Sequence, residues 1–167
     1  MDVIFVRHAS AQDGSEVSDD SQRRLTDKGR TEARTTARAI RELGEKVSVV
    51  LTSPAVRAVE TAETLADEHG AARVEQAQML AHPADAKAVR GRLQQLLAEE
   101  VACVALVGHS PSLDHCIGEL VAAQPKIGIS LSKAGAACVE LPADYPDAAP
   151  ELRWVMRREI LAKLAGQ

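Results

Sequence analysis

Runs of apolar residues that lack polar alternation predict several buried β-strands. The clearest are residues 2–7, 47–51 and 101–107, which consist mainly of Val, Ile, Leu, Phe and Ala. Strands that are covered on both faces have this pattern, because neither side of the pleat meets water. The predicted set is completed by a short extended segment around Val74 and by strands at residues 136–141 and 152–156.

Helices are predicted between these strands from their capping and stop residues. Thr26 has a side chain suited to the N-cap of a helix that runs to about Leu43, where Gly44 ends it. Two Ser-Pro pairs place a capping Ser before a Pro at the first helical position, Ser53 with Pro54 and Ser110 with Pro111. The predicted helices cover residues 27–43, 55–69, 85–99 and 111–122.

Strands that alternate with helices predict an α/β fold, a three-layer α/β/α sandwich with helices on both faces of a mostly parallel sheet. Ligands of such sheets bind beyond the carboxyl ends of the strands. His8, Arg57 and His109 each follow a predicted strand at that edge. Because no composition break or long linker divides the chain, residues 1–167 are expected to form one domain.

Composition and charge exclude several classes of partner. Hydrophobic residues make up 46% of the sequence but aromatic ones only 2%, which predicts a core of small and branched aliphatic side chains. The net charge of −4 comes without a basic stripe, so no nucleic acid is expected. The apolar stretch at the beginning of the sequence ends at Arg7 and His8, so it is too short for the core of a signal peptide or for a membrane span. The three cysteines, Cys103, Cys116 and Cys138, are expected to be buried in the protein core and to bind no metal. This use of cysteine is typical of a protein in the reducing cytoplasm.

Two Arg and two His converge on one edge of the predicted sheet. Arg7 and His8 end the first strand, where a charged pair needs water or a partner. Arg57 lies in the first turn of a helix, where the macrodipole disfavours a cation unless an anion is bound there. His109 follows Gly108 and precedes another helix. Together these side chains can bind a dianionic phosphoryl group and attack it.

This pattern resembles the histidine phosphatase superfamily, whose phosphoglycerate mutase and acid phosphatase members carry an Arg-His-Gly or Arg-His-Ala signature. The signature reads VRHA at residues 6–9. Further matches in order and spacing are residues 23–29 (RRLTDKG), 52–62 (TSPAVRAVETA) and 107–111 (VGHSP). Within the superfamily the chain is similar to the small SixA-type phosphohistidine phosphatases. The resemblance implies a phosphoglycerate mutase-like fold without the helical cap of larger members.

The resemblance implies that His8 is a nucleophile that forms a phosphohistidine intermediate, with its other ring nitrogen held by a backbone carbonyl. Arg7 and Arg57 would clamp the phosphoryl oxygens, and His109 would be protonated when phosphate is bound. No metal or other cofactor is expected. Arg23 and Lys133 are predicted as supporting residues near the phosphate, and so is Asp85.

The identity of a general acid stays open. The region after the third strand lacks the Glu pattern of the mutases, and Ser110 stands where larger acid phosphatases have Asp. Asp85 and Glu75 remain candidates, although each is better explained as a solvated surface residue. His69, His82 and His115 have no motif support and are expected to be exposed or locally bonded. The acidic segment 13–20 is expected to be a solvated loop, with the alternative that it borders the substrate groove because it lies beside His8.

The expected substrate is phosphohistidine on a protein, since its phosphoramidate bond breaks more readily than an ester. Two alternatives stay open. A broad phosphomonoesterase acting on small phosphorylated metabolites would be favoured by a proton donor beside His8. A non-catalytic phosphoprotein-binding module would be favoured by loss of His8 or either Arg, which are all present.

Overall fold

The computed structural model describes residues 1–70 and 73–166. Its centre is a six-stranded sheet in the order β3-β2-β4-β1-β5-β6. Strands β1 to β4 are mutually parallel, β5 is antiparallel to β1, and β6 is antiparallel to β5. The strands are β1 (Asp2–Arg7), β2 (Val49–Thr52), β3 (Arg73–Gln76), β4 (Cys103–Gly108), β5 (Ala136–Glu140) and β6 (Glu151–Met156). The predicted, mostly parallel sheet is confirmed.

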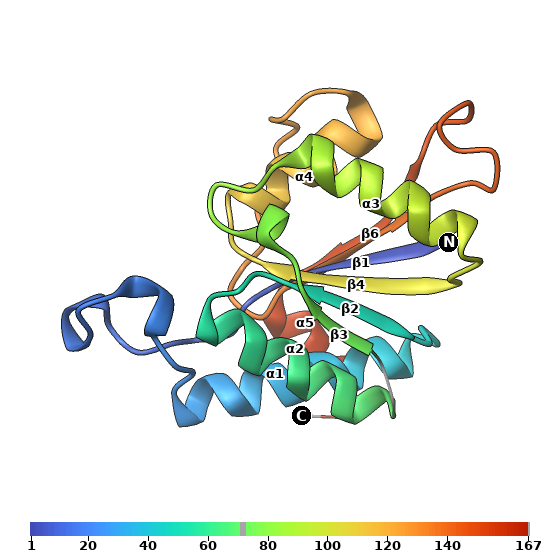
Figure 1. Ribbon diagram of the computed structural model, residues 1–167. Coiled ribbons are helices and arrows are strands. Elements are labelled where there is room, and N and C mark those ends of the chain that lie inside the picture. Colours follow the sequence, from blue (N-terminus) through green and yellow to red (C-terminus); the bar gives the residue numbers. More distant parts are fainter. Residues whose placement is uncertain (71–72, 167) are drawn as a thin grey trace.

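Helices cover both faces of the sheet (Figure 1). One face carries α1 (Asp27–Glu42), α2 (Val56–His69) and α5 (Arg158–Leu164). The other face carries α3 (Ala86–Ala98) and α4 (Ser112–Ala122). This arrangement confirms the three-layer sandwich, while α5 lies beyond the elements predicted from the sequence.

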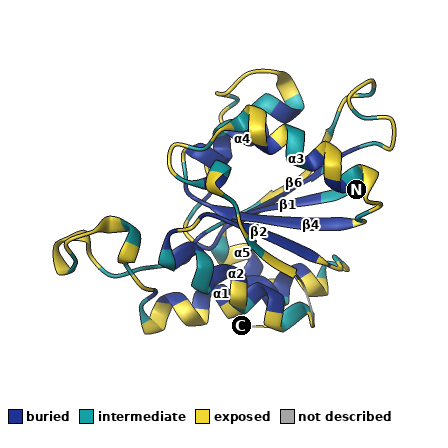
Figure 2. Ribbon diagram, in the orientation of Figure 1, coloured by how far each residue is buried: buried dark blue, intermediate teal, exposed yellow. Residues whose placement is uncertain are grey.

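The central strands are buried on both faces, as their unbroken apolar runs predict (Figure 2). In β1, Val3 and Phe5 belong to the core under α3 and α4, whereas Ile4 and Val6 belong to the core under α1, α2 and α5. Successive side chains of a strand point to opposite faces, so a strand between two helical layers must be apolar at every position. Burial of each such side chain contributes roughly 1.5–3 kcal/mol.

The helix starts differ in part from the prediction. Thr26 caps α1 as expected, because its Oγ1 accepts a hydrogen bond from the backbone of Gly29. The two Ser-Pro pairs were assigned wrongly: α2 starts at Val56 and α4 at Ser112, and neither has a side-chain cap. The Ser53 hydroxyl lies 2.8 Å from Nε2 of His109, and the Ser110 hydroxyl donates to Asp114. The Ser53 hydroxyl is thus taken by a tertiary partner, and the Ser110 hydroxyl by a side chain four residues further along the chain.

All three cysteines are buried and free, as predicted. Burial raises the pKa of Cys116 to about 11 and that of Cys138 to about 12, which makes both thiols poor nucleophiles near neutral pH. Within residues 1–70 and 73–166, none of the helices has the length and apolarity that crossing a bilayer requires.

Candidate active site

The ends of the parallel strands bring His8 and His109 together. Arg7, the last residue of β1, pairs in register with Gly108, the last residue of β4. The next backbone N–H, that of His8, donates to the Gly108 carbonyl at 2.9 Å. The two strands therefore deliver their following histidines side by side, and the ring centroids of His8 and His109 lie 5.1 Å apart.

The backbone fixes the tautomer of His8. Its Nδ1 lies 2.8 Å from the carbonyl oxygen of Ala9. Because a carbonyl only accepts, Nδ1 carries the proton and Nε2 has a lone pair. The Arg57 Nε donates to this Nε2 at 3.3 Å. The expected hydrogen bond between the second ring nitrogen of His8 and a backbone carbonyl is confirmed.

Both histidines are neutral in the free site. Burial is the main cause that lowers the pKa of His8 to about 3; the hydrogen bond with Ala9 opposes this shift, and the charges of His109, Arg57 and Arg7 add to it. Burial followed by the charge of Arg57 lowers the pKa of His109 to about 4. The Arg57 guanidinium donates to Nδ1 of His109 at 3.5 Å, so Nε2 of His109 carries the proton and donates to Ser53. Protonation of His109 therefore requires an incoming anion that raises its pKa.

Arg57 contacts both histidines and the acidic residue of the site. It lies in the first turn of α2 and is only 7% exposed. Besides the two histidines, it contacts Asp20 twice: Nη1 donates to the Asp20 carbonyl at 2.6 Å, and Nη2 to Asp20 Oδ2 at 2.9 Å. Asp20 thus supplies the negative charge that a cation at a helix N-terminus was expected to require.

Among the described residues, the Arg7 guanidinium group is only partly hydrogen-bonded. Its Nη1 donates to the Leu131 carbonyl at 2.8 Å. Its Nε is buried and has no hydrogen-bond partner among the described residues. A buried donor without a partner is costly, and an anion in the neighbouring cavity would remove that cost.

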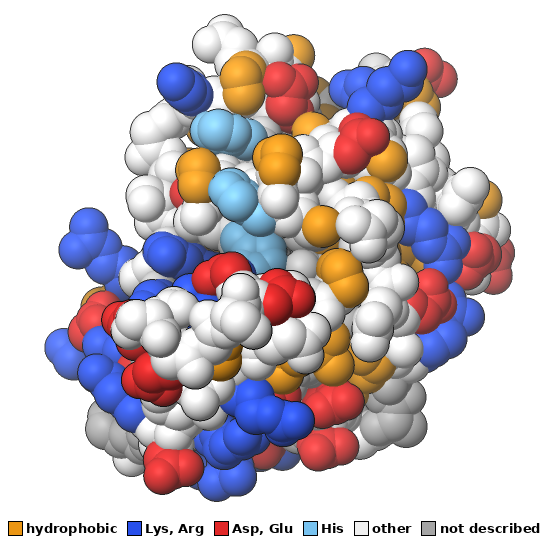
Figure 3. All heavy atoms as spheres, turned by 60° about the vertical axis from the view of Figure 1, so that its left-hand side comes forward, with side chains coloured by type: hydrophobic (Ala, Val, Ile, Leu, Met, Phe, Trp, Pro, Cys, Tyr) orange, Lys and Arg blue, Asp and Glu red, His pale blue; other side chains and the backbone are white. Residues whose placement is uncertain are grey.

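These side chains line a cavity of about 310 Å³. Figure 3 shows this face of the molecule, where a row of histidine side chains borders Lys, Arg and acidic side chains. The lining residues are Arg7, His8, Asp20, Arg23, Arg57, His82, His109, Ser110 and Lys133. A second cavity of about 450 Å³ shares Asp20, Arg57, His82 and His109 with the first, so the two adjoin and form one groove.

The predicted supporting residues divide into two groups. Arg23 and Lys133 line the cavity, and Arg23 donates to Asp20 Oδ1 at 2.9 Å. Asp85 is a correction, because it is absent from the lining of either cavity and its carboxylate caps α3 by accepting from Ala88 at 3.0 Å. Glu75, the other candidate acid, forms ion pairs with arginines outside the cavity instead.

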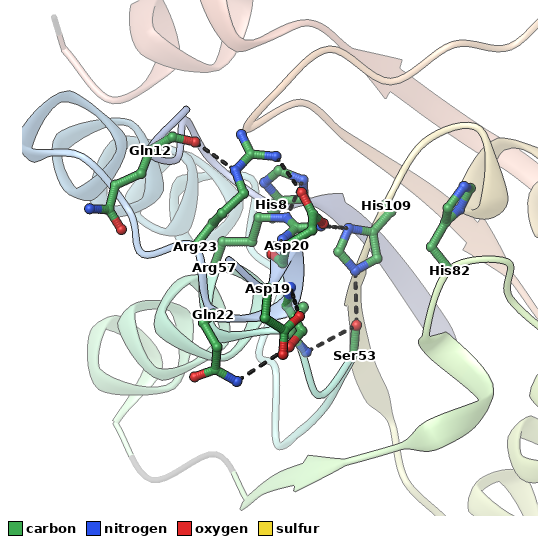
Figure 4. Close-up of polar contacts among 12 residues, drawn as sticks. His8, Gln12, Asp19, Asp20, Gln22, Arg23, Ser53, Arg57, His82 and His109 are labelled. Carbon is green, nitrogen blue, oxygen red and sulfur yellow. Dashed lines mark hydrogen bonds and ion pairs between the residues drawn. The ribbon is translucent and has the colours of Figure 1, made fainter. Parts of the chain in front are cut away.

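His82 is a cavity residue that the sequence did not identify, and Asp20 was predicted only as part of a loop that could border the groove (Figure 4). The acidic segment 13–20 has the composition of a solvated loop, and Asp20 is indeed largely exposed. Only the fold shows that it reaches Arg57. His82 carried no motif, and its distance in sequence from His8 and His109 hides their proximity. Its one available signal was its position after the third strand, whose carboxyl end lies at the same edge of the sheet.

Within the part of the chain that the structure describes, no group of three or more His, Cys, Asp or Glu side chains is placed to hold a metal ion. Most of the side chains that line the first cavity carry guanidinium donors or imidazoles. Such a set can bind a tetrahedral oxyanion and present an unprotonated nitrogen to it.

Comparisons with known proteins agree with this chemistry. The family model of the histidine phosphatase superfamily (branch 1) matches residues 3–83. An uncharacterized protein of Picosynechococcus sp. is 33% identical over 135 residues, which are 81% of this chain and 82% of that protein.

Solved structures extend the likeness to nearly the whole chain. The protein histidine phosphatase SixA, complexed with tungstate, has a TM-score of 0.84 and 28% identity, over 96% of this chain and 99% of that one. A mycobacterial glucosyl-3-phosphoglycerate phosphatase has a TM-score of 0.72 and 18% identity, over 92% and 97% of the two chains, which shows a shared fold. On these grounds the chain belongs to the histidine phosphatase superfamily, as a phosphatase with a SixA-like structure.

Proposed function

We propose that this phosphatase uses His8 as its nucleophile and removes the phosphoryl group from phosphohistidine on proteins. The observation that carries the proposal is the state of His8. The imidazole is held by the Ala9 carbonyl in the tautomer that leaves Nε2 unprotonated, inside a cavity lined by three guanidinium groups. A neutral imidazole nitrogen in a cationic cavity is suited to attack a phosphorus atom whose oxygens are bound.

In the first step, Nε2 of His8 forms a bond to phosphorus while the bond from phosphorus to the leaving group breaks. Arg7 and Arg57 hold the equatorial oxygens, and His109 takes up a proton and donates through Nδ1 as the dianion arrives. In the second step, water attacks the phosphorus, the bond to His8 breaks, and inorganic phosphate leaves. Phosphoryl transfer depends mainly on positioning and charge stabilisation, which these four side chains supply.

Two features support phosphohistidine as the substrate. The chain shares 28% identity and nearly full coverage with a protein histidine phosphatase. In addition, the carboxylate that lines the cavity, Asp20, is not a proton donor, because its hydrogen bond with Arg23 and the charge of Arg57 lower its pKa. A phosphoramidate bond breaks without a carboxylic acid. In addition, a site that lacks the helical cap of larger superfamily members, as the sequence resemblance implies, would admit a side chain of another protein.

The test is a paired assay on purified protein, with phosphate release measured from a phosphohistidine-bearing protein and from p-nitrophenyl phosphate. We expect faster release from the phosphohistidine protein and loss of both activities in His8→Ala. Turnover of the aryl ester alone would retain the His8 chemistry but overturn the protein substrate in favour of small phosphomonoesters. Unchanged rates in His8→Ala would overturn the mechanism.

A further inference from the structure

We propose that His82 is a catalytic proton donor to oxygen leaving groups, which gives this enzyme a second activity toward phosphate monoesters of poorly acidic alcohols. The inference rests on the proposed attack by His8. An alkoxide is a poor leaving group, so ester cleavage requires a proton at the leaving oxygen as the bond to phosphorus breaks. A site that cleaves such esters must contain a group that can hold and release that proton.

His82 is located where such a donor is required. It follows the short 3-10 helix Gln78–Leu80 after β3 and lines both cavities. Its ring centroid lies 6.2 Å from that of His109, which in turn lies 5.1 Å from that of His8. Figure 4 shows His109 between the other two rings. A phosphoryl group bound at His8 and His109 would thus have its leaving group on the side of the groove that His82 borders.

A buried hydroxyl supports His82 in both of its protonation states. Nδ1 of His82 lies 2.7 Å from Oγ of Ser112, which is 5% exposed and also accepts from the Ala84 backbone at 3.2 Å. A hydroxyl can accept from a protonated Nδ1 or donate to an unprotonated one. Among the described residues no protein group bonds Nε2 of His82, so that nitrogen is free to meet a substrate.

The other cavity residues are unsuited to this role. The Asp20 carboxyl has a lowered pKa and is ionised. His109 bonds to Ser53 through Nε2, and its Nδ1 contacts Arg57 in the free site and the phosphoryl group in the proposed mechanism. The Ser110 hydroxyl donates to Asp114. Arginine does not release its proton in proteins, and Lys133 is an exposed cation suited to attracting an anion. His82 is therefore the remaining imidazole with an unoccupied nitrogen.

The proton balance closes over the two steps. As His8 attacks and the bond from phosphorus to oxygen breaks, protonated His82 gives its Nε2 proton to the leaving alcohol. His82 is then neutral, with Nδ1 still donating to Ser112. When water attacks the phosphorus held on His8 and the bond from phosphorus to Nε2 of His8 breaks, Nε2 of His82 accepts a proton from that water, which restores the starting state.

The test compares two substrates of similar size with different leaving groups, p-nitrophenyl phosphate and benzyl phosphate. Nitrophenolate leaves without a proton, whereas benzyl alcohol requires one. For His82→Gln, which cannot act as an acid, we expect kcat/KM for benzyl phosphate to fall about 100-fold more than for p-nitrophenyl phosphate. His69→Gln is the control, since His69 contacts the Ala37 carbonyl away from the cavity and should leave the ratio of the two rates unchanged.

Equal losses on the two substrates in His82→Gln would overturn the proposal, because a merely structural role affects both. Absence of benzyl phosphate turnover in the wild-type protein would overturn it as well. Failure of the proposed function would be recognised separately, because it is tested by the turnover of p-nitrophenyl phosphate and of phosphohistidine in wild type and His8→Ala.

Discussion

At the scale of single residues, His8, His109 and Asp20 compete for the hydrogen-bond donors of Arg57. Its guanidinium is shared among the nitrogens of His8 and His109 and two oxygen atoms of Asp20. A planar fork of fixed donors can meet all of these partners at once, whereas a lysine ammonium presents a single point of charge. The identity of this residue therefore matters more than its charge.

Arg57→Lys is expected to preserve the fold and to lower kcat by roughly 100-fold or more, the cost of losing a preorganised donor to a transition-state oxygen. The measurement is steady-state hydrolysis of p-nitrophenyl phosphate, with circular dichroism to check folding. Arg34→Lys, on the exposed side of α1, is the matched control and should keep the wild-type rate. A loss below threefold in Arg57→Lys would contradict the assigned clamp.

Asp20 occupies Arg57 in the free protein, so an incoming phosphate must compete with its carboxylate. Asp20→Asn is expected to tighten inhibition by inorganic phosphate two- to fivefold, because an ion pair with a largely exposed partner contributes up to about 1 kcal/mol. The inhibition constant of phosphate, measured in both proteins, checks this. Asp19→Asn, which changes the N-cap of the short 3-10 helix Asp20–Gln22, serves as reference. Weaker inhibition in Asp20→Asn would mean that the carboxylate orients Arg57 for phosphate instead.

At the scale of elements, the N-terminus of α1 holds the segment that follows His8. Thr26 donates from its backbone to the Ser10 carbonyl at 3.1 Å, and Glu32 accepts from the Ser10 backbone at 3.0 Å. A Cβ added at Gly29 would lie 1.9 Å from the same carbonyl oxygen. Close approach of the helix to this segment therefore requires glycine.

Gly29→Ala is expected to lower the free energy of unfolding by about 1–3 kcal/mol, the usual cost of forced overpacking, and to reduce turnover by displacing the segment after His8. Urea unfolding and p-nitrophenyl phosphate hydrolysis measure the two effects. Gly91→Ala is the control, since a Cβ there meets nothing within 4 Å in α3; it should stabilise the helix by about 0.5–1 kcal/mol. Wild-type stability in Gly29→Ala would show that the segment yields freely.

At the scale of the whole molecule, the site lies inside the protein's own packing. His8 and His109 are 8% and 6% exposed, and burial is the largest cause of their low pKa values. Folding therefore keeps two imidazoles neutral in a pH range where the unfolded chain protonates them. This difference links the chemistry of the site to the stability of the fold.

The free energy of unfolding should fall as the pH drops below about 6.5, the value of an unperturbed histidine. Between that pH and the folded-state values of about 4 and about 3, the unfolded state binds more protons than the folded state. Each histidine then contributes a loss of up to about 1.4 kcal/mol per pH unit. Urea unfolding at pH 7.5, 6.0 and 5.0 measures the slope, which should be smaller in the double variant His8→Gln/His109→Gln. Equal slopes in the two proteins would contradict the linkage.

Most of the fold could be predicted from local patterns. The run Asp2–Arg7 was assigned residue for residue, because a strand between two helical layers shows its burial in its own composition. The Ser53 and Ser110 caps were wrong, since their hydroxyls bond to His109 and Asp114. The partner of Ser53 is set by the packing of elements far apart along the chain, whereas Ser110 bonds to Asp114 only four residues away and also to the Leu131 carbonyl.

The sequence by itself determined the alternation of strands and helices and the four side chains that lie at or after the ends of β1, β2 and β4, because apolar periodicity and strand ends are local properties. The tertiary structure decided the neighbours of those side chains. It brought Asp20 to Arg57 and His82 to the rim beside His109, and it turned Asp85 to the cap of α3. The physical reason is that hydrogen bonds, burial and the resulting pKa values depend on distances in space, which the parallel sheet creates between residues remote in sequence.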